Sequence, residues 1–410
     1  MRTFVFFCLL LTCRSYAQFS WHLQNSGVTV HLNSTCFTSK TVGWVAGDQG
    51  AILHTTDAGM NWILQNSNEI NDLNGITFFD NTTGWCVGDN GVILKTHDGG
   101  TSWQALSSGV TNNLYSISCS YLDPNILWAC GDATILFSSD GGSSWTQQFN
   151  LPNSVVLYSI EALNSNEAWT VGEQGVALHT VDSGVNWVIH TTLFADDYFD
   201  VNMFNGSYGW MVGDNGKINN TVDGGTWLPQ TSNTTEHMHA ISFYDTLNAV
   251  IVGHNGTLLQ TSDGGFNWNI QSFPSPENLN DVIFFDDSTA VVVADNGKIY
   301  RSPGNVPQNS PDTTAIDDRN QIGDYNLITP NGDGRNDLLY LNLKNEPENI
   351  FILYNRLGVE VHRIINYDNN LVVWDGTDKN GRPLCSSTYF YVFKIPEIGF
   401  VKSDWVELIR

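Results

Sequence analysis

Short apolar runs alternate with polar turns along most of the chain. Residues 73–106 show the pattern clearly, because LNGITFFD is followed by GWCVG, VILKT and SWQAL with turn residues between them. Short runs rich in Val, Ile, Trp and Phe and bounded by such turns predict β-strands. Four strands in roughly 40 residues are typical of one propeller blade.

The same pattern recurs seven times in phase, with a spacing of about 41 residues. A glycine begins a GDNG-like turn between the second and third strands of six units, and Ala294 takes its place in the seventh. A tryptophan opens each fourth strand, and one further copy precedes the first full unit. The glycines are Gly47, Gly88, Gly131, Gly172, Gly213 and Gly253, and the tryptophans are Trp62, Trp103, Trp145, Trp187, Trp227, Trp268 and Trp21.

The turns between second and third strands predict tight hairpins. An Asn-Gly pair suits a two-residue turn of the primed type, in which both residues have positive φ. Such pairs recur at Asn90-Gly91, Asn215-Gly216, Asn255-Gly256 and Asn296-Gly297, whereas Ala133 departs from the pattern in the third unit.

The two ends of the repeat region complement each other. The last unit stops at KIYRSPGN without a tryptophan strand, and FSWHLQNSG (19–27) resembles the strands that close the other units. We therefore predict an all-β fold with a seven-bladed propeller over residues 18–303, in which the N-terminal strand completes the last blade. Closing the ring in this way removes an open sheet edge.

The segments outside the propeller differ in composition. Residues 1–17 combine Arg2, an apolar run and S-Y-A before Gln18, which predicts a secretory signal peptide. Residues 304–324 are polar and predict a linker. Residues 325–410 again alternate between apolar runs and Gly or Asn turns, which predicts a small Ig-like β-sandwich.

The net charge of the chain disfavours two classes of binding partner. The chain has 17 Lys and Arg against 42 Asp and Glu, for a net charge of −25. This charge disfavours nucleic acid and anionic lipid surfaces. No stretch approaches the roughly 20 apolar residues of a transmembrane helix, so we expect no transmembrane segment.

A box of the form T-x-D-G-G-x-x-W lies between the third and fourth strands of six units, and it has the shape of a box found in sialidases. Six copies around a ring cannot share one active site, so we expect each aspartate to stabilise its own turn. Sialidases bind their anionic substrate with several Arg, and this chain has no Arg between Arg14 and Arg301. The structural Asp boxes are Asp57, Asp98, Asp140, Asp182, Asp223 and Asp263, the fifth box being one residue short.

The cysteines leave two alternatives open. Cys119 and Cys130 flank a turn at Asp123-Pro124-Asn125, so they could face each other across a hairpin and form a disulfide after export. The alternative is that both are small buried apolar groups.

Other candidate sites carry weaker signals. Asn331, Asp333 and Asp337 have oxygen ligands for calcium, but the run lacks the Gly and Glu of an EF-hand and favours a turn. Glu236, His237 and His239 with His254 have only part of a zinc ligand set, and the run at 195–200 favours a solvated loop. We predict no cofactor, no metal and no catalytic residue.

Two resemblances to known families follow from these motifs. Residues 19–303 resemble Asp-box propellers such as the photosystem II assembly factor-like proteins and, more distantly, sortilin. The phrases ITPNGDGRND, YNRLG, WDGTDKNG and TYFYV in residues 325–410 resemble the gliding motility-associated C-terminal domain, the type B sorting domain of type IX secretion. The first resemblance implies a scaffold that binds other proteins. The second implies export to the cell surface or medium through a translocon that reads residues 325–410.

We therefore expect a secreted or cell-surface binding protein without enzymatic activity, whose propeller holds an unidentified surface protein or glycan. The alternative is a secreted polysaccharide hydrolase with paired carboxylates near the propeller axis. A third interpretation makes the propeller a passive spacer in a surface assembly.

Overall fold

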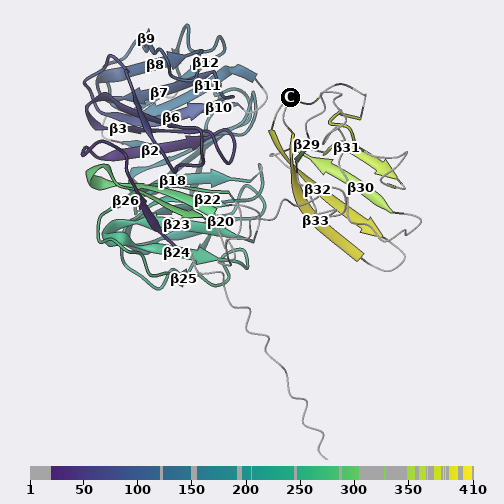
Figure 1. Cartoon of the computed structure of the whole chain (residues 1–410). Coiled ribbons are helices and arrows are strands. Elements are labelled where there is room, and N and C mark those ends of the chain that lie inside the picture. Colours follow the sequence, from purple (N-terminus) through teal and green to yellow (C-terminus); the bar gives the residue numbers. More distant parts are fainter. Residues whose placement is uncertain are drawn as a thin grey trace, which may run out of the picture.

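A computed structural model covers the chain (Figure 1). It describes residues 20–303 except 121–122, 149–154, 192–195, 205, 244–246 and 286–288, and in the C-terminal region residues 327–328, 349–355, 360–365, 367, 374–379, 382, 384, 387–395 and 400–408. The predicted signal peptide (1–17) and linker (304–324) lie outside the described residues. No helix in these ranges is long and apolar enough to cross a membrane.

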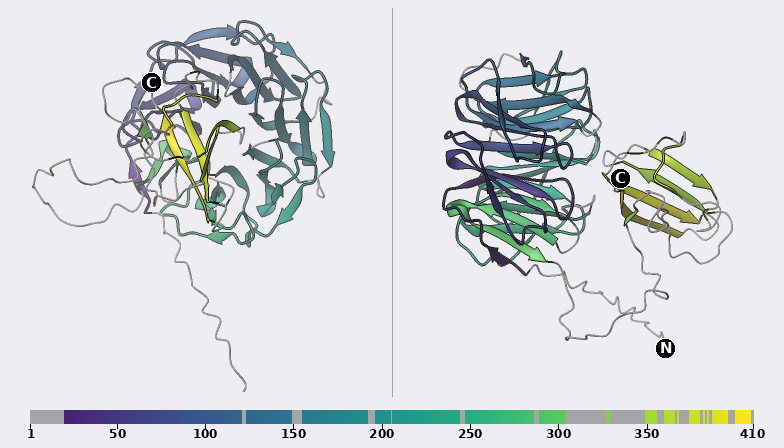
Figure 2. Two further views of the ribbon diagram at one scale, coloured as in Figure 1. Left: turned by 90° about the vertical axis from the view of Figure 1, so that its right-hand side faces the viewer. Right: turned by 45° about the horizontal axis from the view of Figure 1, so that its top comes forward.

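Seven four-stranded antiparallel sheets follow one another around a ring, which Figure 2 shows end-on in its left view. Blades 1 to 3 are β2–β5 (Leu32–Phe37, Gly43–Gly47, Ala51–Thr55, Ile63–Gln65), β6–β9 (Leu73–Phe78, Gly84–Gly88, Val92–Thr96, Gln104–Ser107) and β10–β13 (Leu114–Ser120, Asp123–Gly131, Thr134–Ser138, Thr146–Gln147). Blades 4 to 6 are β14–β17 (Leu157–Ala162, Ala168–Gly172, Val176–Thr180, Val188–Thr191), β18–β21 (Tyr198–Met203, Gly209–Gly213, Ile218–Thr221, Leu228–Gln230) and β22–β25 (Met238–Phe243, Ala249–Gly253, Leu258–Thr261, Asn269–Ile270).

The N-terminal strand completes the seventh blade, as predicted. This blade contains β26 (Leu279–Phe284), β27 (Thr289–Ala294) and β28 (Ile299–Pro303), and β1 (His22–Gln24) adds the fourth strand. The β1–β28 register places His22 opposite Arg301. The two ends of the propeller therefore close one sheet.

The turns between second and third strands have the predicted geometry. Asn90 and Gly91 have φ values of 57° and 72°. A Cβ atom on Gly91 would lie 2.2 Å from the carbonyl oxygen of Val110, so only glycine fits this turn. Six blades carry this turn as a short 3₁₀ segment, η1 to η6 (Asp48–Gly50, Asp89–Gly91, Glu173–Gly175, Asp214–Gly216, His254–Gly256, Asp295–Gly297).

The core lies between adjacent blades. In blades 1 to 5 the second strand carries a fully buried tryptophan, and Trp44 of blade 1 stacks on Phe78 of blade 2. Each apolar cluster of the propeller joins residues of two neighbouring blades, as where Trp44 packs with Leu73 and Trp103. Burial of these large rings against the next blade stabilises the whole ring.

The possible disulfide between Cys119 and Cys130 is not present. The register of β10 and β11 places Cys119 opposite Leu127 and Cys130 opposite Ser116, so the two side chains lie on separate rungs. Both thiols are buried, and burial raises the pKa of Cys130 to about 12. The second alternative, small buried groups, is therefore the correct one.

The C-terminal region contains one five-stranded sheet in the order β29-β33-β32-β30-β31. Its strands are Leu327–Ile328, Phe400–Leu408, Ser387–Ile395, Ile350–Tyr354 and Glu360–Ile365 in that order. Trp374, Phe351 and Tyr391 lie in its apolar cluster. The remainder of the predicted sandwich lies outside the described residues.

Candidate binding site at the axial mouth

Each Asp-box carboxylate is hydrogen-bonded within its own turn. Asp98 accepts from Thr96 Oγ1 at 2.9 Å, from Ser102 N at 2.8 Å and from Ser102 Oγ at 2.7 Å. The fifth box is one residue shorter, so its aspartate bonds to nearer backbone groups. Asp223 accepts from Gly225 N and Thr226 N at 2.9 and 2.7 Å. These bonds hold the pKa of Asp223 down at about 2.

The same boxes also join neighbouring blades. Gly99 O accepts from Trp44 Nε1 of the preceding blade at 3.0 Å, and Gly141 O accepts likewise from Trp85 Nε1 at 3.0 Å. In blade 1, Ala58 O accepts from Arg301 Nε of blade 7 at 2.7 Å. All six boxes make such a bond, and the other donors are Gln148, His190 and Gln230. A stabilising role for the six aspartates stays a prediction, but their bonds leave little capacity for a ligand.

The opposite end of the blades, where η1 to η6 lie, carries a different ring of side chains. The second residue of every innermost strand sits at a register shift in the ladder. Such bulges re-aim side chains. We call this ring of one residue per blade the axial mouth, and its members are Asn33, Asn74, Tyr115, Tyr158, Phe199, His239 and Asn280.

Amides form one half of the axial mouth. Asn74 Nδ2 donates to Asp89 Oδ1 of its own blade at 3.0 Å and to Leu114 O of the next blade at 3.0 Å. Asn33 and Asn280 make the matching pair of bonds in blades 1 and 7. This half of the ring is therefore fixed by bonds within and between blades.

Aromatic rings form the other half, which we call the aromatic arc. Tyr115, Tyr158, Phe199 and His239 come from four consecutive blades, and each is partly exposed. Successive ring centroids lie 5.9, 5.1 and 5.9 Å apart. The arc is a continuous, partly exposed row of rings, and successive ring planes are inclined by 49°, 65° and 84°.

Carboxylates surround the aromatic arc. Tyr158 Oη donates to Glu173 Oε1 at 3.4 Å, and burial followed by the charges of Glu173 and Asp197 raises the pKa of Tyr158. Burial and the nearby charge of Asp132 also raise the pKa of Tyr115. These tyrosines stay neutral in a field of negative charge.

Three histidines meet at one edge of the arc. The ring centroid of His254 lies 4.8 Å from that of His237 and 4.4 Å from that of His239, so the sequence placed them correctly in one blade. His237 Nδ1 bonds Asp214, and burial lowers the pKa of His239 to about 4. Within the described ranges no group of three such residues has a geometry that could hold a metal ion.

Two aspartates lie one position further along the innermost strands, at the third residue of β18 and β26. Burial raises the pKa of Asp200 to about 6 and that of Asp281 to about 7, and the charge of Asp200 adds to the second shift. Asp200 Oδ2 accepts from Ile241 N of the next blade at 2.9 Å, and Asp281 Oδ2 accepts from Thr35 N at 2.7 Å.

Serines make the same inter-blade bond at the equivalent position of other blades. Ser116 Oγ accepts from Ile160 N at 3.2 Å, and Ser34 Oγ accepts from Ile76 N at 3.4 Å. Asp200 and Asp281 thus make the inter-blade bond that serines make in other blades.

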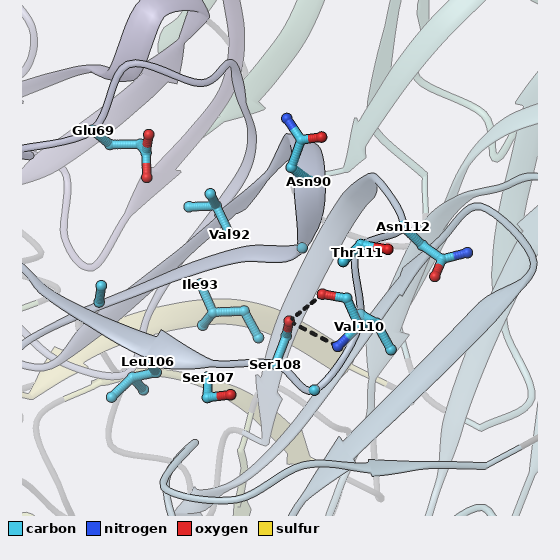
Figure 3. Close-up of a pocket in the computed structure, with 13 residues that line it drawn as sticks. Glu69, Asn90, Val92, Ile93, Leu106, Ser107, Ser108, Val110, Thr111 and Asn112 are labelled. Atoms are coloured by element: carbon cyan, nitrogen blue, oxygen red, sulfur yellow. Dashed lines mark hydrogen bonds between the residues drawn. The ribbon is translucent and has the colours of Figure 1, made fainter.

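A pocket of about 660 Å³ on blade 2 is lined by residues of β8 and β9 and by the segment that leads to β10 (Figure 3). Small, aliphatic and amide side chains line it, and Ser108 Oγ is bonded to the backbone of Val110. Glu69 is its single titratable group, and its carboxylate accepts from Ile70 N and Asn71 N. We find no basis for catalysis in this pocket.

Sequence reasoning missed the axial mouth. The segment at 195–200 was expected to be a solvated loop, but Tyr198 is buried and begins the innermost strand β18. The signal was present in the phase of the repeat, because each ring member is the second residue of the first apolar run of its unit, as in Leu73-Asn74 and Leu114-Tyr115. The calcium candidates Asn331, Asp333 and Asp337 lie outside the described residues.

Comparison with protein families agrees with the fold. The family described as photosynthesis system II assembly factor YCF48 matches residues 14–114, 101–193 and 190–310, which together exceed half of the chain. The chain belongs to this YCF48 family. Residues 322–408 of this YCF48-family chain match the CHU_C type IX secretion signal domain. The search of curated proteins found no match.

Solved structures similar to this YCF48-family chain are propellers. YCF48 bound to D1 peptide has 19% identity and a TM-score of 0.60, covering 70% of this chain and 99% of that one. YCF48 from Cyanidioschyzon merolae has 17% identity and a TM-score of 0.59, covering 69% and 98%. The WD40 repeats of RRP9 have 9% identity and a TM-score of 0.60, covering 69% and 97%. At these identities the likeness shows the fold alone, and the chain is a secreted propeller protein with a type IX signal.

Proposed function

We propose that the exported propeller is a binding protein that holds an extended segment of a surface protein at its axial mouth and leaves it chemically unchanged. The observation that carries this proposal is the aromatic arc, a row of four partly exposed rings in contact with one another. Aromatic side chains give large contact areas at low cost in conformational entropy. A peptide in a solved YCF48 structure is consistent with this mode of binding.

The mouth is also preorganised. Asp89 holds Asn74, and Glu173 accepts both from Tyr158 Oη and, at 3.1 Å, from Val156 N. A surface fixed in this way loses little freedom on binding, which favours affinity. The six Asp boxes lie at the other end of the blades, where each aspartate is hydrogen-bonded within its own turn.

The alternative is a hydrolase that uses Asp200 and Asp281, whose raised pKa values favour it. We favour binding because each carboxylate already accepts a backbone N–H of the next blade. Serines do the same in other blades, which points to a structural origin.

The test presents the full exported chain with surface proteins and with neutral polysaccharides, and records both retention and product release. The variant Phe199→Leu removes one ring of the arc while keeping an apolar side chain. Its matched control is Phe266→Ala, which removes a ring that is 91% exposed in the sixth Asp box at the far end of the blade. We expect retention without products, weakened only by Phe199→Leu. Product release abolished by Asp281→Asn would establish the hydrolase instead.

A further inference from the structure

The aromatic arc has a definite electrostatic character. Glu173 accepts from Val156 N and Tyr158 Oη, and Asp197 accepts from Gln174 N at 2.8 Å. These donors are neutral, so they leave the negative charges in place. The carboxylates therefore act on the rings of the arc as unneutralised charges.

Basic side chains do little to offset this charge. Between residues 20 and 303 the sequence holds only Lys40, Lys95, Lys217, Lys298 and Arg301. Lys217 Nζ lies 3.3 Å from Asp196 Oδ2, and Lys298 pairs with Glu277, so the two lysines that adjoin η4 and η6 are already matched by carboxylates. His239, whose pKa is lowered to about 4, is neutral at pH 7.

Flat rings within a negative field match one chemical class of ligand. A cation over an aromatic face is attracted by the ring quadrupole, and nearby carboxylates add ordinary Coulomb attraction. An anionic segment would meet repulsion at the same place. A neutral sugar could stack on the rings but would gain nothing from the carboxylates.

We propose that the aromatic arc binds the Lys or Arg side chains of a basic, extended segment in a partner protein. This inference rests on the proposed function and adds the charge of the ligand to it. The cationic group lies against the edge-to-face pair of Tyr158 and Phe199, and Glu173 and Asp197 provide the opposing charge.

The experiment uses the full chain and four synthetic peptides of equal length on a Gly-Ser backbone, carrying spaced Lys, Arg, Glu or no charge. Fluorescence anisotropy gives the Kd of each at low salt and at about 0.5 M salt, where screening reduces exposed charge interactions. We expect Lys and Arg peptides to bind more tightly than the neutral peptide by about tenfold or more, and to lose most of that advantage at high salt.

Matched variants locate the binding. Phe199→Leu is expected to weaken basic-peptide binding by about 3- to 30-fold, and Glu173→Gln should reduce the salt dependence. Phe266→Ala, which removes an exposed ring outside the axial mouth, should bind as the parent. Equal affinity for all four peptides, or equal loss in Phe266→Ala, would overturn the inference.

A failure of the cationic-ligand inference can be distinguished from a failure of the proposed function. Retention of a neutral or acidic partner that Phe199→Leu weakens would leave the axial mouth as the binding site and would overturn only the cationic ligand. Loss of all retention at the mouth would overturn both.

Discussion

Asp200 and Asp281 are acidic side chains at the third position of an innermost strand, where the other blades have serine, glycine or alanine. Burial disfavours the charged form of both, and the charge of Asp200 also disfavours that of Asp281. The folded protein is therefore more stable when these carboxyl groups are protonated than when they are charged. The fold is less stable at neutral pH because a carboxylate stands where a serine hydroxyl can accept the same backbone N–H of the next blade.

The first prediction concerns the pH dependence of stability. Asp281 has its pKa raised from 3.8 to about 7 in the fold, so its stabilising contribution is present below pH 4 and is lost as pH rises through 7. The variant Asp281→Asn should gain stability relative to the parent between pH 4.5 and 8, on the order of 1 to 3 kcal/mol. Urea denaturation at both pH values measures this. A difference between variant and parent that does not change with pH would contradict the shift.

At the scale of single residues, the sequence predicted the tight turns correctly but did not reveal the role of the third residue of each innermost strand. Asn90 and Gly91 have the predicted positive φ because local sterics alone decide that conformation. The sequence did not reveal the position of Asp200, because that position depends on the bulge in β18 and on the bond to Ile241 of the next blade. Neither is local in the sequence.

At the scale of elements, the Asp box is a turn and an inter-blade joint together. In blade 6 the carboxylate of Asp263 accepts from Thr261 Oγ1, Asn267 N and Asn267 Nδ2 at 2.8, 2.9 and 2.7 Å. Gly264 O of the same turn accepts from Gln230 Nε2 of blade 5 at 3.2 Å. A distorted box therefore affects two blades.

The second prediction tests this role. Asp263→Ala leaves the N–H of Asn267 and the hydroxyl of Thr261 without their acceptor, and should cost about 1 kcal/mol or more in free energy of unfolding. Thermal unfolding at pH 7 measures the loss, with Phe266→Ala in the same turn as the control. Ligand binding at the axial mouth should be unchanged. A fully stable Asp263→Ala protein that has lost binding would show that the box belongs to a functional site.

Sequence alone identified every blade, because the repeat places four strands and two turns in phase seven times. The cysteines show its limit. Whether Cys119 meets Cys130 depends on the register of β10 and β11, which contains shifts at both ends. A turn at Asp123–Asn125 indicated a hairpin but could not fix which residues face each other across it.

At the scale of the whole molecule, the ring is closed by one short strand. β1 pairs with β28, and Ser26 Oγ donates to Gly297 O at 2.5 Å, joining residues that are 271 positions apart. Trp21 packs on Phe273, with ring centroids 5.1 Å apart, which connects the closing strand to blade 6.

The third prediction follows from this closure. Deletion of residues 18–27 removes the fourth strand of blade 7 and exposes the edge of β28, so the entire propeller should unfold at lower temperature as one unit. Calorimetry of the exported chain with and without the segment measures the change. A truncated chain with the Tm of the parent would contradict the closed ring.

The most direct test of the central claim is hydrogen–deuterium exchange of the full chain with and without the ligand that the retention screen selects. Binding at the axial mouth predicts slower exchange at the starts of the innermost strands, around Tyr115, Tyr158 and Phe199, and no change in the Asp boxes at the far end of the blades. Protection confined to the Asp boxes, or unchanged exchange around the mouth, would contradict the account.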